Sequence, residues 1–310
     1  MKIIFFGSSD FSIPVLESLL SSKHSVILVI TTPDQKKGRG QVLAPSVVKA
    51  FARQRYLTVE APRKLSLPDV VQDIKKLNPD LIVIASYGKI VPSAIFMTPR
   101  IAALNVHPSL LPRHRGASPI QQAILEGDKK TGVSVAEVTS ELDAGDLLGQ
   151  VEIEIDKNEN ALELSKRLAE MGAKLLLQTL GQLEAGKINK IKQDVSKATY
   201  AKKLNKNDGQ IDWATPASYI HNQVRAYYLW PMAFTFFRGK RLQILKTCCA
   251  ETHSDACKPG TITDIKKESL DIQTQAGTIA LIRVQLEGRR ETSGFEFAIG
   301  QRIKKGERFE

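Results

Sequence analysis

The stretch IAALNVHPSLLP, residues 101–112, joins a continuous apolar run to a polar turn. The run lacks the polar alternation of a half-exposed strand, so it is typical of a strand buried on both faces of a sheet. Comparable runs occur elsewhere in the first half of the chain, at 2–7, 25–31, 80–86 and 133–138. Helical patterns lie between many of these runs, at 46–55, 69–77 and 117–126. This alternation predicts an α/β domain with a doubly wound, mostly parallel, Rossmann-like sheet.

The C-terminal third of the chain has a different pattern. Apolar residues at helical spacing run from 159 to 185 and close on Gly186, which predicts the last helix of the α/β domain. Beyond a basic stretch, short apolar runs alternate with turns, a pattern typical of a small β-barrel. We therefore predict an α/β domain at 1–186, a basic linker at 187–206 and an OB-like β-barrel domain at 207–310.

Composition excludes several classes of protein. The chain has 310 residues, of which 42% are hydrophobic and 25% are charged, as in a globular protein. Its three cysteines form no CxxC pair, which argues against a zinc ribbon or a disulfide scaffold. No apolar run reaches the ~18 residues of a membrane-spanning helix, and the N-terminus has no cleavable signal pattern. We expect a cytoplasmic protein with no membrane partner.

The turn after the first predicted strand argues against two common cofactors. It reads Gly7-Ser8-Ser9-Asp10-Phe11, with one glycine where the dinucleotide fingerprint needs three. The sequence also lacks the GxxxxGK[ST] pattern of a P-loop. NAD and ATP are therefore not expected. A ligand is still expected at the carboxyl ends of the strands, where loops and helix N-termini converge.

The net charge of +11, from 44 Lys and Arg against 33 Asp and Glu, is concentrated in two segments. One is the first 120 residues, and the other is 186–206, where seven lysines accompany one acidic residue. Such stripes favour a polyanion such as a nucleic acid as the partner. A solubilising surface would have the same composition, so charge alone leaves both interpretations open.

The polar turn after the 101–106 run carries the first candidates for chemistry. Side chains alternate along a strand, so Asn105 and His107 project to the same side, and Pro108 favours extended geometry at His107. The amide can stabilise an oxyanion, and the imidazole can move a proton near neutral pH. Asp143 and Asp146 lie near Gly145 in a downstream loop, from which a carboxylate can orient that imidazole. Each segment could instead be structural, as a hydrogen-bonded strand end or as a turn.

Asn105, His107, the HPSLLP sequence at 107–112 and the LDAGD loop at 142–146 together resemble the folate-dependent formyltransferase family. The resemblance implies that Asn105, His107 and Asp143 are catalytic and that 10-formyltetrahydrofolate is the formyl donor. It also implies that tetrahydrofolate lies along four residues of the turn, Ser109, Leu110, Leu111 and Pro112. No metal is implied, because the sequence has no cluster of ligands at metal-binding spacing.

Further segments narrow the resemblance within the family. Residues 113–135 resemble the formyltransferases that act on methionyl-tRNA or on amino sugars, and those at 208–213 and 228–236 resemble the β-barrel of the tRNA enzymes. The resemblance covers essentially the whole chain and implies a monomer that formylates methionyl-initiator tRNA. A loop at 32–41 matches the one that reaches into the acceptor stem in the tRNA enzymes. The candidate tRNA contacts are cations of this loop and of the linker, Lys36, Lys37, Arg39, Lys203 and Lys206.

Three other functions remain open at the level of the sequence. A formyltransferase for an amino sugar on a nucleotide would share the three catalytic residues and the folate but would not bind a polyanion. Attack by water in place of the amine would make the chain a hydrolase of formyltetrahydrofolate. A tRNA-binding module with an inactive α/β domain would carry the basic segments without catalysing a reaction.

Overall fold

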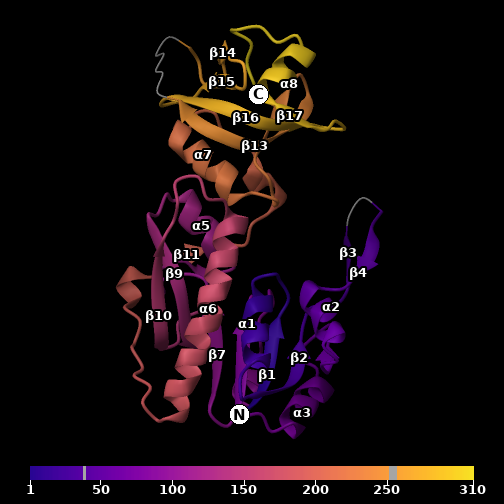
Figure 1. The fold of residues 1–310 in the computed structure, drawn as a ribbon, viewed down its shortest axis with the longest axis vertical. Coiled ribbons are helices and arrows are strands. Elements are labelled where there is room, and N and C mark those ends of the chain that lie inside the picture. Colours follow the sequence, from indigo (N-terminus) through magenta and orange to yellow (C-terminus); the bar gives the residue numbers. More distant parts are fainter. Residues whose placement is uncertain (38–39, 251–256) are drawn as a thin grey trace. The chain divides into compact units, whose positions relative to one another are not determined.

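The structure is a computed structural model that describes residues 1–37, 40–250 and 257–310 (Figure 1). The chain divides into two compact units. The first comprises Met1–Pro119, Lys130–Glu154 and Leu164–Lys202, and the second comprises Ile120–Lys129, Ile155–Glu163 and Lys203–Glu310. Most of the basic stretch that follows residue 186 therefore belongs to the first unit.

A seven-stranded sheet forms the centre of the first unit, in the order β10-β9-β7-β6-β1-β2-β5. Its strands are β1 (Lys2–Gly7), β2 (Ser25–Ile30), β5 (Val59–Glu60), β6 (Leu81–Ala85), β7 (Ala102–His107), β9 (Lys130–Glu137) and β10 (Leu147–Glu154). Neighbouring strands from β7 to β5 are parallel, whereas β9 runs antiparallel to both β7 and β10. The predicted mostly parallel α/β sheet is thus confirmed.

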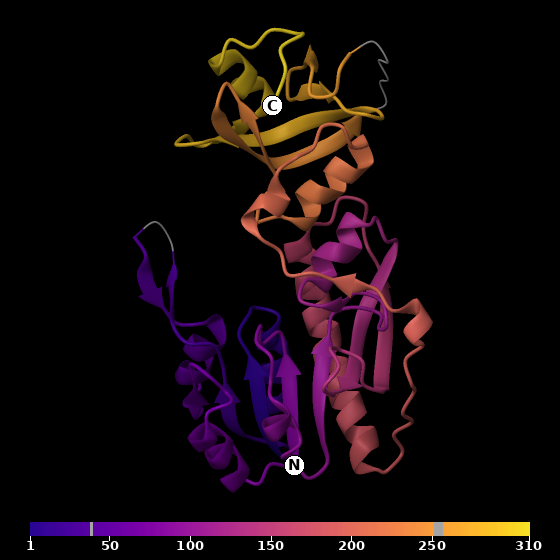
Figure 2. The same cartoon turned by 180° about the vertical axis from the view of Figure 1, so that it is seen from behind.

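Helices cover both faces of this sheet (Figure 1 and Figure 2). They are α1 (Ser12–Leu20), α2 (Val47–Gln54), α3 (Pro68–Lys76), α4 (Ser93–Phe96) and α6 (Ala161–Glu184). On one face, Ile4 of β1 packs in an apolar cluster with Ile74 of α3 and Ile95 of α4. On the other face, Gly172 lets α6 approach β7, because a Cβ there would lie 2.9 Å from the side chain of Val106. This two-sided packing explains why the strands are continuous apolar runs.

The second unit contains a six-stranded antiparallel sheet, in the order β12-β13-β16-β15-β14 with β17 paired to β16. Its strands are β12 (Phe234–Phe237), β13 (Lys240–Ala250), β14 (Ile262–Ile265), β15 (Leu270–Gln273), β16 (Thr278–Leu286) and β17 (Glu291–Ser293). Its core joins Leu281 of β16 to Ile220 of α7 (Ala217–Ala226) and Phe297 of α8 (Gly294–Gly300). The sheet is curled into a half-barrel, which confirms the predicted barrel-type β domain.

Several short elements were not expected from the sequence. They are the hairpin of β3 (Gln35–Lys37) and β4 (Val42–Ala44), the parallel pair of β8 (Arg115–Gly116) and β11 (Tyr200–Ala201), and 3₁₀ turns at Val195–Lys197 and Lys206–Gly209. The helix α8 was also missed, although the capping box of Ser293 and Glu296 marks its start. The predicted helix at 117–126 is α5 (Pro119–Leu125). Among the described residues, none of the helices is both long and apolar enough to cross a membrane.

Candidate active site

The strand β7 lies inside the sheet and ends at the first two candidate residues. Its residues alternate between the two faces, so Asn105 and His107 share the face of Ala103, and Val106 lies on the face covered by α6. His107 is the last residue of the strand and pairs in register with Ser134 of β9. Its ring is buried, with 4% of the residue exposed. The alternation that the sequence predicts therefore holds at this strand end.

Asp143 brings these two side chains together. The Nδ2 atom of Asn105 donates a hydrogen bond of 2.9 Å to its Oδ1, and the backbone N–H of Gly116 donates one of 2.8 Å to its Oδ2. The Nδ1 atom of His107 lies 3.7 Å from the same Oδ2. One carboxylate thus engages an amide and an imidazole at the same time. All three residues predicted as catalytic lie at one place in the first unit.

The partner of the His107 ring fixes which nitrogen can accept a proton. Its Nε2 lies 3.0 Å from the backbone carbonyl oxygen of His114. A carbonyl oxygen only accepts hydrogen bonds, so Nε2 carries the hydrogen in the neutral ring. The lone pair is therefore on Nδ1, the atom that faces Asp143. A proton taken up at Nδ1 would form an imidazolium stabilised by that carboxylate.

The loop that carries Asp143 has a demanding backbone conformation. Asp143 has φ +50°, in the left-handed region that Asp tolerates better than most side chains. Gly145 lies so close to the backbone of Glu137 that a Cβ would overlap the carbonyl oxygen. Close packing against the Glu137 backbone therefore requires the glycine of the LDAGD sequence.

In the turn after His107, two side chains are buried and two are partly exposed. Ser109 and Leu111 are buried, and the Oγ of Ser109 donates a hydrogen bond of 2.6 Å to the Arg113 carbonyl. Leu110 and Pro112 are half-buried. The first pair shapes the turn, while the second pair retains surface that a ligand can contact. The folate contacts assigned to these four residues stay a prediction.

The five predicted tRNA contacts lie in different parts of the chain. Lys36 is exposed on β3, and Lys37 is the last residue of that strand. Arg39 lies outside the described residues. Lys203 and Lys206 are exposed and belong to the second unit. Their contact with RNA stays a prediction.

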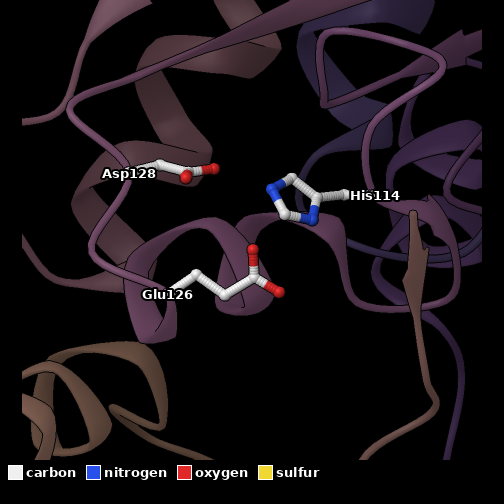
Figure 3. Close-up of side chains that lie close together, drawn as sticks. All are labelled: His114, Glu126 and Asp128. Carbon is white, nitrogen blue, oxygen red and sulfur yellow. The ribbon is translucent and has the colours of Figure 1, made fainter. Parts of the chain in front are cut away.

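Figure 3 draws three side chains whose types can ligate a metal ion, His114, Glu126 and Asp128. His114 belongs to the first unit and the two carboxylates to the second, so we assign no metal site to them. His114 instead contacts the candidate site through its backbone. Its carbonyl faces the His107 ring, and its N–H donates a hydrogen bond of 2.8 Å to the Oγ1 of Thr199.

Two residues beside the Asp143 loop were not singled out from the sequence. Arg115 is fully buried, and Gln193 donates a hydrogen bond to the backbone carbonyl of Asp143. Arg115 follows the HPSLLP turn closely and could have been considered for that reason. Gln193 lies 50 residues beyond Asp143, in the basic stretch whose lysines favour a nucleic-acid partner. Nothing in the sequence pattern marks it.

Comparison with known proteins identifies the family. A family model described as formyl transferase matches residues 1–180, and a model described as the formyl transferase C-terminal domain matches residues 203–302. The chain belongs to the formyl transferase family. It is 41% identical over 311 residues to a methionyl-tRNA formyltransferase of Sulfurihydrogenibium sp., in an alignment that covers 100% of both chains.

Two solved structures share the fold of this formyl transferase at lower identity. The methionyl-tRNA formyltransferase from Clostridium thermocellum has a TM-score of 0.57 at 18% identity, covering 82% of this chain and 95% of that one. WlaRD, a sugar 3N-formyl transferase crystallised in the presence of dTDP and 5-N-formyl-THF, has a TM-score of 0.67 at 17% identity. That match covers 94% of this chain and 99% of the other. At these identities the likeness concerns the fold alone.

The close packing at Gly145 predicts that adding a single methyl group there will lower activity. Gly145→Ala should displace the Asp143 loop, because the Cβ would overlap the Glu137 carbonyl, and should lower the rate of formyl transfer at least tenfold. Gly181→Ala is the matched control, since a Cβ at this position of α6 meets open space. We expect that control to retain activity and to gain about 0.5–1 kcal/mol of stability. Steady-state kinetics and thermal unfolding test both variants, and wild-type turnover in Gly145→Ala would contradict the loop geometry.

Proposed function

We propose that the chain transfers the formyl group of 10-formyltetrahydrofolate to the α-amino group of methionyl-initiator tRNA, giving formylmethionyl-tRNA for translation initiation. The observation that carries the reaction is the carboxylate of Asp143, which engages Asn105 and His107 together. The acceptor is supported by the 41% identical relative named methionyl-tRNA formyltransferase, which aligns along the full length of the chain. The support for an amino-sugar acceptor comes from fold likeness at 17% and 18% identity.

His107 serves as the general base in this proposal. An α-amino group has a pKa near 8, so it must lose a proton before or during attack on the formyl carbon. The Nδ1 lone pair accepts that proton, and the Asp143 carboxylate at 3.7 Å stabilises the resulting imidazolium. The same proton can then pass to the departing nitrogen of tetrahydrofolate. The Nε2–H stays bonded to the His114 carbonyl throughout.

Asn105 stabilises the charge that develops on the formyl oxygen. An amide NH₂ group has two donor hydrogens, and the structure records one bond from it, to Asp143 Oδ1. The second hydrogen is thus the donor for the tetrahedral oxyanion. In other enzymes, loss of one such donor typically lowers the rate by a factor of ~10²–10³. The bond to Asp143 holds the amide in place, so little reorganisation is needed in the transition state.

The turn at Ser109, Leu110, Leu111 and Pro112 is the proposed folate contact. Its half-buried residues, Leu110 and Pro112, offer apolar surface next to His107, as a folate ring requires. The relative WlaRD was crystallised with a formylated folate, which supports a folate donor for this family member. The three catalytic residues supply general-base and oxyanion chemistry of their own, and the proposed reaction includes no metal.

In the proposed reaction, basic side chains of both units bind the tRNA phosphates. The residues proposed to contact tRNA phosphates are Lys36, Lys37, Arg39, Lys203 and Lys206. We also propose that the protein is a monomer and that it acts in the cytoplasm. The division into a catalytic domain at 1–186, a basic linker at 187–206 and a tRNA-binding domain at 207–310 is part of the same proposal. The match of the C-terminal family model to residues 203–302 supports the last of these domains.

A comparison of acceptors tests the function. Purified protein is given 10-formyltetrahydrofolate with methionyl-tRNA, a dTDP-linked amino sugar or water alone, each at two salt concentrations. We expect formyl transfer to the tRNA, with a KM that rises steeply with salt because phosphate contacts release counterions. If only the amino sugar received the formyl group, methionyl-tRNA would be excluded as the acceptor. If formyltetrahydrofolate were only hydrolysed, the protein would not be a formyl-transferring enzyme.

Replacement of the base separates chemistry from tRNA binding. His107→Ala should lower kcat to the background rate, because the proton of the α-amino group then has no acceptor. Its affinity for methionyl-tRNA should remain within about twofold of wild type. Single-turnover kinetics and filter binding measure the two quantities. A His107→Ala variant that kept most of its kcat would exclude His107 as the base.

The salt dependence of binding tests the predicted loop contact. Arg39→Ala should reduce the slope of log K against log salt by about one, since one phosphate contact is lost. Lys76→Ala, an exposed lysine on α3 that pairs with Asp73, is the control and should leave the slope unchanged. Binding isotherms at four salt concentrations give both slopes. Equal slopes and equal kcat/KM for Arg39→Ala and wild type would remove this residue from the interface.

A further inference from the structure

The side chain of Gln193 links the basic stretch to the loop that carries Asp143. Its Nε2 donates hydrogen bonds of 2.8 Å to the backbone carbonyl of Asp143 and 2.7 Å to that of Gly145. Its Oε1 accepts from the Nε of Arg115 at 3.1 Å and from the Nη2 at 2.9 Å. Because the nitrogen faces two acceptors and the oxygen faces two donors, only this orientation of the amide satisfies every partner.

Arg115 holds the other end of this amide. Its side chain is fully buried on β8, and its Nη1 lies 3.2 Å from Oε1 of Glu141. A buried guanidinium is costly unless its donors are bonded, so the oxygen of Gln193 is a needed acceptor. The backbone of Arg115 is fixed as well, since its N–H donates a hydrogen bond of 2.8 Å to the Thr199 carbonyl.

The backbone around Gln193 is anchored to the first unit on both sides. Before it, Ile191 and Leu147 exchange reciprocal backbone hydrogen bonds of 2.8 and 2.9 Å. After it, β11 pairs in parallel with β8. Gln193 therefore reaches the loop from a segment that cannot shift freely.

We infer that Gln193 is a positioning residue for the reaction, which acts by holding the Asp143 loop in its left-handed conformation. One amide bonds two carbonyls of the loop, those of Asp143 and Gly145, on either side of Ala144. Without these bonds, the positive φ of Asp143 relaxes, and its carboxylate moves away from Asn105 and His107. This inference rests on the proposed function, because it assumes that Asp143 serves catalysis.

The test begins with Gln193→Glu. A carboxylate can still accept from Arg115, but it has no hydrogen to donate and repels the two carbonyls of the loop. We expect kcat to fall at least tenfold while the KM for methionyl-tRNA stays within twofold. Gln182→Glu makes the same chemical change at an exposed position on α6 and should leave both constants unchanged. If Gln193→Glu folds poorly, Gln193→Met replaces it in the same measurement of kcat and KM, because the methionine side chain is neutral and has no hydrogen-bond donor.

A double-mutant cycle shows whether Gln193 acts through Asp143. The Asp143→Asn substitution removes the carboxylate charge. Because asparagine also adopts a positive φ readily, the substitution disturbs the backbone little. If Gln193 only positions Asp143, then adding Gln193→Glu to Asp143→Asn should change kcat less than twofold. A full tenfold further loss would overturn the positioning role, as would wild-type kcat in Gln193→Glu and Gln193→Met. Wild-type kcat in Asp143→Asn alone would instead refute the proposed role of Asp143.

Discussion

The proposed active site depends on one carboxylate that makes three different contacts. Asp143 accepts from the Asn105 amide and from the backbone N–H of Gly116, and it faces Nδ1 of His107. In the proposed reaction, these contacts set the orientation of the Asn105 amide as oxyanion donor and the side on which His107 takes up its proton. A carboxylate bonded on both oxygens has little freedom to rotate, so the geometry of the two other residues is fixed before substrate binds.

The chain supports this carboxylate from segments far apart in sequence. The end of β7 supplies Asn105 and His107, and the β8 segment supplies Gly116 and Arg115. The stretch after α6 supplies Gln193. Burial of the Arg115 guanidinium requires acceptors, and Gln193 meets that requirement while it bonds the loop carbonyls. The stability of a buried cation and the geometry of the proposed active site are thereby linked.

The sequence predicted what depends on local pattern and missed what depends on distant contacts. Apolar runs and helical spacing predicted the parallel sheet, and alternation along one strand predicted that Asn105 and His107 share a face. Asp143 was found through the family resemblance rather than from its spacing. Gln193 could not be found, because its role arises only when the chain returns to the loop after α6. The short strands β8 and β11 were missed for the same reason, since two-residue strands have no periodicity.

The tautomer of His107 is the most direct test of this arrangement. Two-bond ¹H–¹⁵N correlation spectra of protein labelled with ¹⁵N-histidine distinguish a ring protonated on Nε2 from one protonated on Nδ1. The signal of His107 is assigned by its loss in the His107→Ala variant. The structure predicts that the neutral ring carries its hydrogen on Nε2, bonded to the His114 carbonyl. Hydrogen on Nδ1 would contradict the account, because the lone pair would then face away from Asp143.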